Sequence, residues 1–309
     1  MNTLFALDIG GTQIKAARVS ESGQLLSLRK VPTPPTLDAF RSVASSLAAE
    51  FGPGAIAAGI GCKGRIDEDS TRVLVLPGTL RYLEGHALRD IFQLGSLPVK
   101  ADNDARVALR GETRWGALQG FSDAIMLTLG TGVGGGVVSG GRILHGASGL
   151  AGHLGHYTVH PDGELCICGN RGCLETLFSA KALEAAAYSV IHRGTASTLL
   201  DKAPQPSCAD VFHAAQSGDP AAHHIVHRAV LALGAALAGL VFIFDPQIIV
   251  LGGQIADAGD FLLLPLRQIV HDRTYAMLRR DVPIVRTSLD DPSGLLGAAA
   301  LALEAAAKC

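Results

Sequence analysis

The chain has 309 residues and a formal net charge of −2; 48% of the residues are hydrophobic and 17% are charged. This length suits two domains with large cores, and the balanced charge argues against a nucleic-acid partner. The start, MNTLFALDIGG, lacks the pattern of a signal peptide, and the apolar run 229–244 is short for a membrane span. We therefore expect a cytoplasmic protein that has no membrane partner.

Apolar runs and helical periodicity predict an alternating α/β order in the first half of the chain. A strand, a glycine-rich turn and a second strand occur near 4–20 and again near 124–144, which suggests two duplicated α/β lobes that face each other. We expect strands at 3–9, 14–20, 55–61, 99–101, 124–129 and 135–139, and helices at 36–50 and 103–117.

The second half of the chain is mostly helical by its pattern. A long helix is predicted to begin after Asp219, with Pro220 as its first residue, and to end before Asp245-Pro246. Its apolar character fits a buried helix. Further helices are expected at 180–192, 209–215 and 293–308, and a strand at 247–251.

One histidine and three cysteines lie close together in the sequence. His156 is followed by Cys166, Cys168 and Cys173. One imidazole and three thiolates form a complete tetrahedral set for Zn²⁺ and leave no position for a reacting water, which indicates a structural metal. His160 is an alternative to His156 as the ligand. A disulfide with a spare thiol is the alternative to a metal, and a thiol-rich metal site suits a reducing compartment.

Three glycine-rich turns each follow an apolar strand. Glycine lets backbone amides approach phosphate oxygens, and threonine adds a hydroxyl donor. Neither a Walker motif nor a dinucleotide motif is predicted, because no Gly-Lys-Ser/Thr follows and strands succeed the first two turns. Each turn alone fits a plain hairpin, but three together favour a nucleotide cleft between lobes. The turns contain Gly10, Gly11 and Thr12; Gly130, Thr131, Gly132 and Gly134; and Gly252 and Gly253.

Two carboxylates lie at strand ends. Asp8 adjoins the first turn, where it can hold Mg²⁺ over phosphates or only cap the turn. Asp104 lies at a strand-to-helix junction, where it can take the proton of an acceptor hydroxyl during phosphoryl transfer or only cap the helix. Groups that pair with adjacent sugar hydroxyls are supplied by Asn103, Asp104, His156 and Glu175.

These segments resemble the ROK family (repressor, open reading frame, kinase) of sugar kinases, within the actin-like ATPase superfamily. The resemblance covers nearly the whole chain, and the His156 and cysteine cluster, similar to the zinc module of the family, is its most specific mark. The other matching segments are DIGGTQIKAA at 8–17, ADNDARVALRGE at 101–112, LTLGTGVGGGVV at 127–138, DPQIIVLGG at 245–253 and SGLLGAAALA at 293–302.

The resemblance implies an α/β fold, the two-lobed actin-like ATPase (ribonuclease H-like) fold, whose interlobe cleft closes over ATP, Mg²⁺ and a hexose. The small lobe would comprise 1–118, and the helix at about 294–309 would pack back towards it. The large lobe would comprise 119–293 and carry a zinc-binding loop at 153–175. Family members are often homodimers or homotetramers, so we expect one of these assemblies.

The resemblance also implies a role for each site residue. Asp104 would be the general base for the 6-hydroxyl of the sugar, and structural Zn²⁺ would fix the tautomer of His156. The sugar would be contacted by Asn103, Asp104, His153, His156, Glu175, Gly64 and Thr79, and the nucleotide by Asp8, Lys15 and the three glycine turns.

Two departures from the family pattern bear on the sugar. Most family kinases carry a glutamate three residues before the zinc histidine, where this chain has His153. Neutral imidazole has one donor and one acceptor, whereas a carboxylate has only acceptors. Bacterial N-acetylmannosamine kinases of the family share the histidine, which favours that sugar unless His153 only packs against the zinc loop. The second departure is Gly78-Thr79, where many family glucokinases have a sugar-binding asparagine.

Several alternatives remain within the family. A glucokinase or another hexokinase is the main one. A transcriptional repressor is disfavoured because the first predicted strand begins at residue 3, which leaves no room for a winged helix before it. A sugar-binding relative without catalysis is disfavoured because Asp8 and Asp104 are both present.

Overall fold

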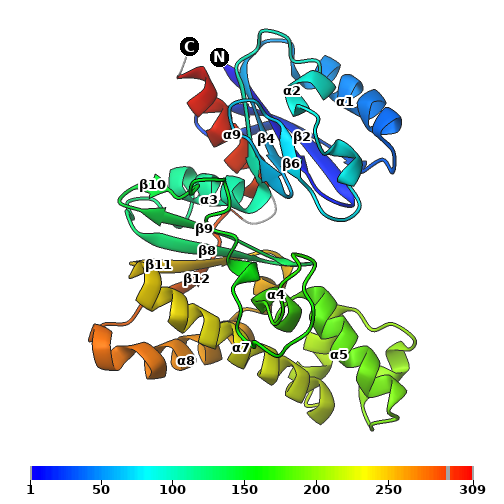
Figure 1. The fold of residues 1–309 in the computed structure, drawn as a ribbon, viewed down its shortest axis with the longest axis vertical. Coiled ribbons are helices and arrows are strands. Elements are labelled where there is room, and N and C mark those ends of the chain that lie inside the picture. The colour runs from blue at the N-terminus through cyan, green and yellow to red at the C-terminus, as the bar shows by residue number, and fades with distance from the viewer. Residues whose placement is uncertain (1, 290–292, 308–309) are drawn as a thin grey trace. The chain divides into compact units, whose positions relative to one another are not determined.

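The computed structural model describes residues 2–289 and 293–307, and the chain folds into two compact units (Figure 1). Unit 1 comprises Met1–Gly120, Ile143–Gly152 and Thr287–Cys309, and unit 2 comprises Phe121–Arg142 and His153–Arg286. Residues 119–120, 143–152 and 287–289, which the sequence analysis assigns to the large lobe, belong to unit 1. One reason is Glu112, a fully buried carboxylate of unit 1 that accepts hydrogen bonds from Thr287 Oγ1 and from the Leu289 amide.

Unit 1 contains a five-stranded mixed sheet in the order β3-β2-β1-β4-β7. Strands β1, β4 and β7 are parallel, and β2 and β3 continue the sheet as antiparallel neighbours. A two-stranded ribbon of β5 and β6 accompanies it. The strands are β1 (Thr3–Ile9), β2 (Gln13–Ser20), β3 (Leu25–Pro32), β4 (Ala55–Cys62), β5 (Arg65–Ile66), β6 (Val73–Val75) and β7 (Val99–Asn103).

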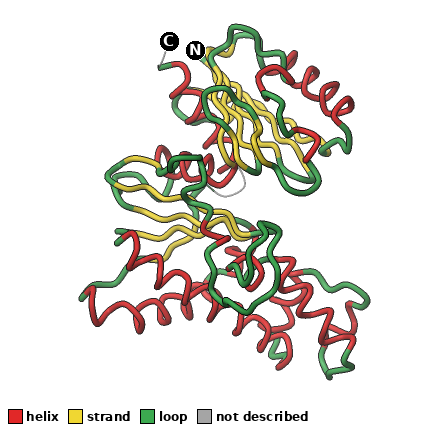
Figure 2. Tube along the Cα trace, viewed as in Figure 1, coloured by secondary structure: helices red, strands yellow, loops and turns green. Residues whose placement is uncertain are grey.

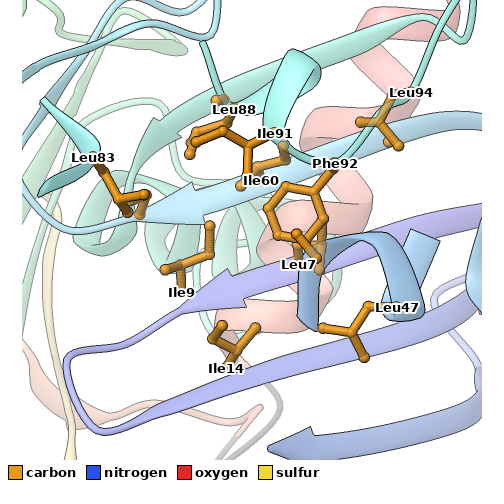
Figure 3. Close-up of a cluster of buried hydrophobic side chains, with 14 of the residues drawn as sticks. Leu7, Ile9, Ile14, Leu47, Ile60, Leu83, Leu88, Ile91, Phe92 and Leu94 are labelled. Atoms are coloured by element: carbon orange, nitrogen blue, oxygen red, sulfur yellow. The ribbon is translucent and has the colours of Figure 1, made fainter. Parts of the chain in front are cut away.

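Both faces of this sheet are covered at β1 and β4, because the side chains of these strands alternate between two cores. Phe5, Leu7 and Ile9 of β1 face a cluster that includes α1 (Leu37–Phe51) and α2 (Leu88–Ile91), part of which Figure 3 draws. Leu4 and Ala6 face the opposite cluster, with α3 (Asp104–Trp115) and α9 (Ser293–Ala306). The continuous apolar run of β1 is therefore that of a strand covered on both faces.

Helix α9 approaches the sheet and α3 unusually closely. A Cβ on Gly59 of β4 would lie 1.9 Å from the Ala298 carbonyl oxygen, and one on Gly297 would lie 1.8 Å from the Val107 carbonyl oxygen. Only glycine fits at such contacts. The small residues of the closing helix thus bring α9 against both β4 and α3, and residue 308, the end of the predicted helix, lies outside the described residues.

Unit 2 repeats the sheet topology of unit 1, with strand order β10-β9-β8-β11-β12. An antiparallel hairpin again adjoins two parallel strands, which agrees with the predicted duplication. The strands are β8 (Ala124–Leu129), β9 (Val133–Ser139), β10 (Arg142–Ile143), β11 (Ile248–Gly252) and β12 (Ile284–Arg286). The helices, drawn red in Figure 2, are α4 (Leu174–Leu177), α5 (Ala180–His192), α6 (Cys208–Gln216), α7 (Pro220–Phe244) and α8 (Asp260–Leu278).

Helix α7 is the central helix of unit 2 and packs against α4, α5, α6 and α8. Asp219 caps its first turn by accepting a hydrogen bond from the Ala222 amide, as predicted, and Asp245 ends it in the left-handed conformation. The helix is long and apolar enough to cross a membrane, but 61% of its most apolar window is buried inside the protein. This burial fits a core helix.

Candidate active site

The parallel strands of unit 1 bring the predicted catalytic segments to one edge of the sheet. Ile9, at the end of β1, pairs with Cys62 at the end of β4, and Cys62 pairs with Asn103 at the end of β7. In open α/β sheets, ligands bind beyond the carboxyl ends of such strands. The first glycine turn, the segment after Cys62, and Asp104 all begin at this edge.

The first glycine turn is a tight hairpin between β1 and β2. The Gly10 amide donates to the Gln13 carbonyl (3.0 Å), while Gly11 and Thr12 are exposed. Lys15 stands directly across the hairpin from Asp8, so the two side chains share a face of the sheet. The exposed residue Thr79 belongs to the same place, because a Cβ on Gly11 would lie 3.5 Å from Thr79 Oγ1.

Asn103 caps α3 and orders the turn before Asp104. Its Oδ1 accepts hydrogen bonds from the amides of Ala105 (3.1 Å) and Arg106 (3.4 Å). Its Nδ2 donates to the Gly64 carbonyl (3.0 Å), and Gly64 adopts a positive φ of 93° that favours glycine. The helix-capping role that the sequence left open for Asp104 thus belongs to Asn103.

Asp104 is half-buried and begins α3, with its Oδ1 held by the Ala105 amide at 2.9 Å. Burial raises the pKa of the Asp104 carboxyl, and the positive charge of the nearby Lys63 opposes that rise. Burial and the carboxylates of Asp104 and Asp8 raise the pKa of the Cys62 thiol far above its usual range, so Cys62 remains a neutral neighbour of both carboxylates. Asp104 is a carboxylate whose pKa is shifted toward that of an effective base.

A network of charged side chains surrounds Glu68 and Asp102, near the end of β7. The His145 imidazole lies 3.0 Å from Glu68 Oε2 and 3.2 Å from Asp102 Oδ2. Hydrogen bonds to Asp102 and Glu68 raise the pKa of His145 to about 9. Although burial opposes it, the hydrogen bond from His145 and the nearby cations lower the pKa of Glu68 to about 2 and that of Asp102 still further. Glu68, Asp102 and His145 have the composition of a metal site, but Lys100 and Arg110 already neutralise the carboxylates.

In unit 2 the second and third glycine turns also meet at one edge. The Gly130 amide donates to the Gly132 carbonyl (3.0 Å), and the Gly130 carbonyl accepts from the Ala180 amide at the start of α5 (2.8 Å). Gly252 pairs with Thr128, and a Cβ on Gly253 would lie 2.3 Å from the Leu129 carbonyl oxygen. The hairpin that contains Thr131 and Gly134 therefore lies beside the end of β11.

The β8–β9 hairpin contacts both Glu175 and the segment 153–156. Glu175 Oε2 accepts a hydrogen bond from the Val133 amide (2.8 Å). Gly155 packs directly on this strand, because a Cβ there would lie 1.9 Å from the Val133 carbonyl oxygen. The second glycine turn and the predicted sugar contacts His153, His156 and Glu175 are thus joined within unit 2.

The four predicted zinc ligands converge in the loop before α4, and the ligand atoms of His156 and the three cysteines all lie within 4.8 Å of one another. His156 Nδ1 is 3.5 Å from Cys166 Sγ, and Cys168 Sγ is 3.6 Å from Cys173 Sγ. Tetrahedral bonds of about 2.3 Å to sulfur and about 2.0 Å to nitrogen place ligand atoms roughly 3.5 to 3.8 Å apart. The donor set therefore fits Zn²⁺. His156 belongs to it, and the alternative ligand His160 does not.

His153 directly precedes the short helical turn Leu154–His156 and is half-buried. Its ring lies nearly parallel to that of His156, with the ring centroids 6.4 Å apart and an interplanar angle of 19°. His153 is therefore a close neighbour of a predicted zinc ligand.

Sequence reasoning missed Lys63 and Arg106 as members of the unit 1 site. Lys63 directly follows β4, and its strand-end position was the signal that could have revealed it. Arg106 is 1% exposed and pairs with Asp102. The spacing of four between Arg106 and Arg110 was its signal, because such residues share one face of α3.

The comparisons with known proteins bear on the whole chain. A profile of the ROK family matches residues 4–305. The chain belongs to the ROK family. It is 36% identical to the glucokinase of Thermotoga maritima, with 97% of each chain covered, and 34% identical to the N-acetylmannosamine kinase of Shigella boydii, with 97% of this chain and 98% of that one covered.

A ROK glucokinase from Streptomyces griseus, solved with glucose and AMPPNP, superposes with a TM-score of 0.84 at 34% identity over 98% of this chain and all of the other. The fold is the actin-like ATPase fold of ROK kinases, as the sequence predicted. This ROK protein is an ATP-dependent carbohydrate kinase.

Proposed function

We propose that this ROK protein transfers the γ-phosphoryl group of ATP to the 6-hydroxyl of an N-acetylhexosamine or hexose, with N-acetylmannosamine as its preferred acceptor. The choice of sugar depends on His153. This histidine lies beside His156, at the position where most ROK kinases have a glutamate. The choice rests on the hydrogen-bonding difference between imidazole and carboxylate.

Asp104 is the proposed general base. The Ala105 amide fixes one carboxylate oxygen, and burial raises the pKa of the group, which strengthens it as a proton acceptor. Phosphoryl transfer needs little covalent chemistry from the protein beyond orientation and charge stabilisation. Asp104 would orient the acceptor hydroxyl and take its proton, while Asn103, Gly64 and Thr79 line the same edge of unit 1.

The nucleotide would be held by the backbone amides of the glycine turns. In unit 1 these amides belong to the exposed turn at Gly11 and Thr12, and Asp8 and Lys15 flank them. One protein carboxylate suits Mg²⁺, which keeps several waters and takes its other ligands from substrate phosphates. The bound Mg²⁺ would neutralise charge on the phosphates. In unit 2 the turns at Gly130–Gly134 and Gly252–Gly253 would complete the nucleotide contacts.

His156, Cys166, Cys168 and Cys173 would hold a structural Zn²⁺. Because Nδ1 of His156 faces Cys166 Sγ, the metal would fix its tautomer and leave Nε2 for a sugar hydroxyl. Glu175 begins its helix directly after Cys173, so the same metal would also order the carboxylate on the second glycine hairpin. Three thiolate ligands suit a reducing compartment, and we therefore place the protein in the cytoplasm.

We also propose a homodimer or homotetramer. Large apolar side chains stay exposed on α7 and α8, among them Phe242 (53%), Ile243 (58%) and Leu264 (57%). Sedimentation at micromolar concentration measures the assembly, and a monomer would refute it.

Glucose is the second candidate acceptor. The glucokinase of Thermotoga maritima is 36% identical to this chain and the N-acetylmannosamine kinase of Shigella boydii 34%, a difference too small to separate the two sugars. The absence of the family asparagine near Gly78-Thr79 disfavours glucose, and His153 favours the N-acetylated sugar.

The test is a coupled ADP-release assay with ATP and Mg²⁺ on N-acetylmannosamine, glucose, mannose, N-acetylglucosamine, fructose and allose. We expect the highest kcat/KM with N-acetylmannosamine. A higher kcat/KM with glucose would contradict the proposed sugar and leave the kinase activity standing.

His153→Glu gives the matched variant, because it restores the residue of most ROK kinases. We expect it to lower kcat/KM for N-acetylmannosamine relative to glucose by about tenfold or more, the cost of one or two mismatched hydrogen bonds. His160→Glu, an exposed change on the same loop, is the control. An unchanged ranking in His153→Glu would assign His153 to packing.

A further inference from the structure

Arg106 is a fully buried cation whose hydrogen bonds point in two directions. It is 1% exposed. Its Nε and Nη2 donate to Asp102 Oδ1 at 2.9 and 2.6 Å. Its Nη1 donates to the carbonyl oxygens of Gly149 (2.8 Å) and Ala151 (3.1 Å). One guanidinium therefore joins the end of β7 to a segment more than forty residues away in sequence.

The hydrogen bonds from Arg106 to Asp102 reach the residues that position Asp104, the proposed base. Asp102 is fully buried, and its Oδ1 also accepts the Asn103 amide at 2.7 Å. Asn103 in turn caps α3, of which Asp104 is the first residue. The position of Asp104 thus depends on Asp102, and the charge of Asp102 is balanced by Arg106.

The other hydrogen bonds of Arg106 reach the segment 146–152, which contains no helix or strand. Gly146, Gly149 and Gly152 all adopt positive φ angles, and none of the residues lies in a helix or strand. Glycine-rich backbone loses much conformational entropy when it is ordered. The hydrogen bonds from Arg106 hold its backbone two residues before His153, the first residue of the proposed acceptor-binding motif.

We propose that Arg106 is a positioning residue for the phosphoryl acceptor. Its guanidinium fastens the backbone at Gly149 and Ala151 to the turn that carries Asp104, and so sets the point from which the His153 motif departs. The inference rests on the proposed sugar-kinase function. Stability alone does not explain a buried ion pair, because apolar replacements of buried pairs are often as stable.

Arg110 provides a matched control on the same helix. It is 6% exposed and belongs to the same network, where it pairs with Glu304 (2.6 Å), Glu68 (3.0 Å) and Asp102 (3.3 Å). Its Nη2 also lies 3.1 Å from His145 Nε2, but none of its described hydrogen bonds reaches a backbone carbonyl of 146–152. Replacement of either arginine thus removes a buried charge. The Ala151 amide also donates to the His145 carbonyl (3.0 Å), but the described side-chain hydrogen bonds to the carbonyls of 146–152 come from Arg106.

The experiment compares Arg106→Met with Arg110→Met in the full-length protein. Hydrogen exchange is followed at the amides of 146–152, and sugar KM, ATP KM and kcat are measured with the preferred sugar. We expect Arg106→Met to speed exchange in 146–152 by at least tenfold and to raise sugar KM by about tenfold, with ATP KM within twofold. Arg110→Met should leave exchange in 146–152 and sugar KM near their wild-type values.

Equal changes in both variants, or an unchanged sugar KM in folded Arg106→Met, would overturn the proposal. If Arg106→Met does not unfold cooperatively, Arg106→Lys replaces it, because lysine keeps the charge and cannot bond Asp102 and both carbonyls together. A wild type that phosphorylates none of the sugars would refute the proposed function. Hydrogen exchange does not depend on catalysis, so the difference in exchange between the two variants would still decide whether Arg106 holds the segment 146–152.

Discussion

Replacement of His145 tests whether the buried charge network stabilises unit 1 in a pH-dependent way. His145 Nε2 faces the carboxylates of Glu68 and Asp102 at 3.0 and 3.2 Å. Arg110 Nη2 lies 3.1 Å from the same nitrogen. Lys100 and Glu304 complete the surroundings through Glu68 and Arg110. His145→Gln removes the titrating group and keeps one side-chain donor.

The size of the stability contribution follows from the pKa of His145, which rises from 6.5 to about 9 in the folded protein. At about 1.36 kcal/mol per pKa unit this shift corresponds to roughly 3 kcal/mol of unfolding free energy. The side chain is 36% exposed, and Arg110 repels the imidazolium at close range. Solvent screening and this repulsion reduce the contribution to about 1 to 2 kcal/mol.

The contribution of His145 to stability changes with pH in the direction expected of a group whose pKa is raised on folding. Below pH 6.5 the imidazole is protonated in both the folded and the unfolded chain, so its contribution is complete. As the pH rises toward 9, the unfolded chain loses the proton first and the contribution decreases. Above about pH 9 both states are neutral, and the contribution is gone.

Urea unfolding of wild type and His145→Gln between pH 5.5 and 10 measures this difference. We expect the variant to be less stable by about 1 to 2 kcal/mol at pH 6 and nearly equal at pH 10. His271→Gln is the control, because His271 and Asp281 form an exposed pair worth at most about 1 kcal/mol. A difference for His145→Gln that is constant over this range would refute the assignment of a protonated His145.

Three further predictions concern catalysis and metal. Asp104→Asn should keep the fold and sugar binding while kcat falls about 100-fold or more; near-normal turnover would remove Asp104 from the role of base. Cys168→Ser should lower zinc content below the one ion per chain expected of wild type and raise sugar KM, and wild type free of zinc by elemental analysis would contradict the structural metal. Lys63→Met should move the acidic limb of the kcat/KM profile to higher pH, because the Lys63 charge lowers the pKa of the base; the control is Lys181→Met, and an unmoved limb would exclude Lys63.

Most of the fold could be predicted because most elements carry a strong local signal. The helix after Asp219 has an N-cap, a proline at its first position and an apolar run, and it begins and ends at the predicted residues. Strand β3 was missed because its residues are almost all exposed at a sheet edge and show no alternation. Helix α8 was missed as well, and Pro265 lies inside it, a residue that normally argues against a helix.

The candidate site was predictable where chemistry is local and hidden where it depends on distant partners. The predicted zinc ligands lie within one loop, and their residue types indicate the ligand set. The role of Arg106 depends on carbonyl groups of Gly149 and Ala151, which carry no side-chain signal. The attachment of Glu175 to Val133 likewise uses a backbone amide, so only the structure reveals it.

The repeated topology of the two units shows where they differ around the proposed base. By strand order, the hairpin β1–β2 corresponds to β8–β9, and each has a glycine turn suited to phosphate. Strand β7 corresponds to β12, and here the units diverge. β7 ends at Asn103 and leads into Asp104 and a capped helix, whereas Thr287, directly after β12, is bound by Glu112 of unit 1. The residue that follows β7 is thus Asp104, the proposed base, whereas the residue that follows β12 is Thr287, with which the chain returns to unit 1.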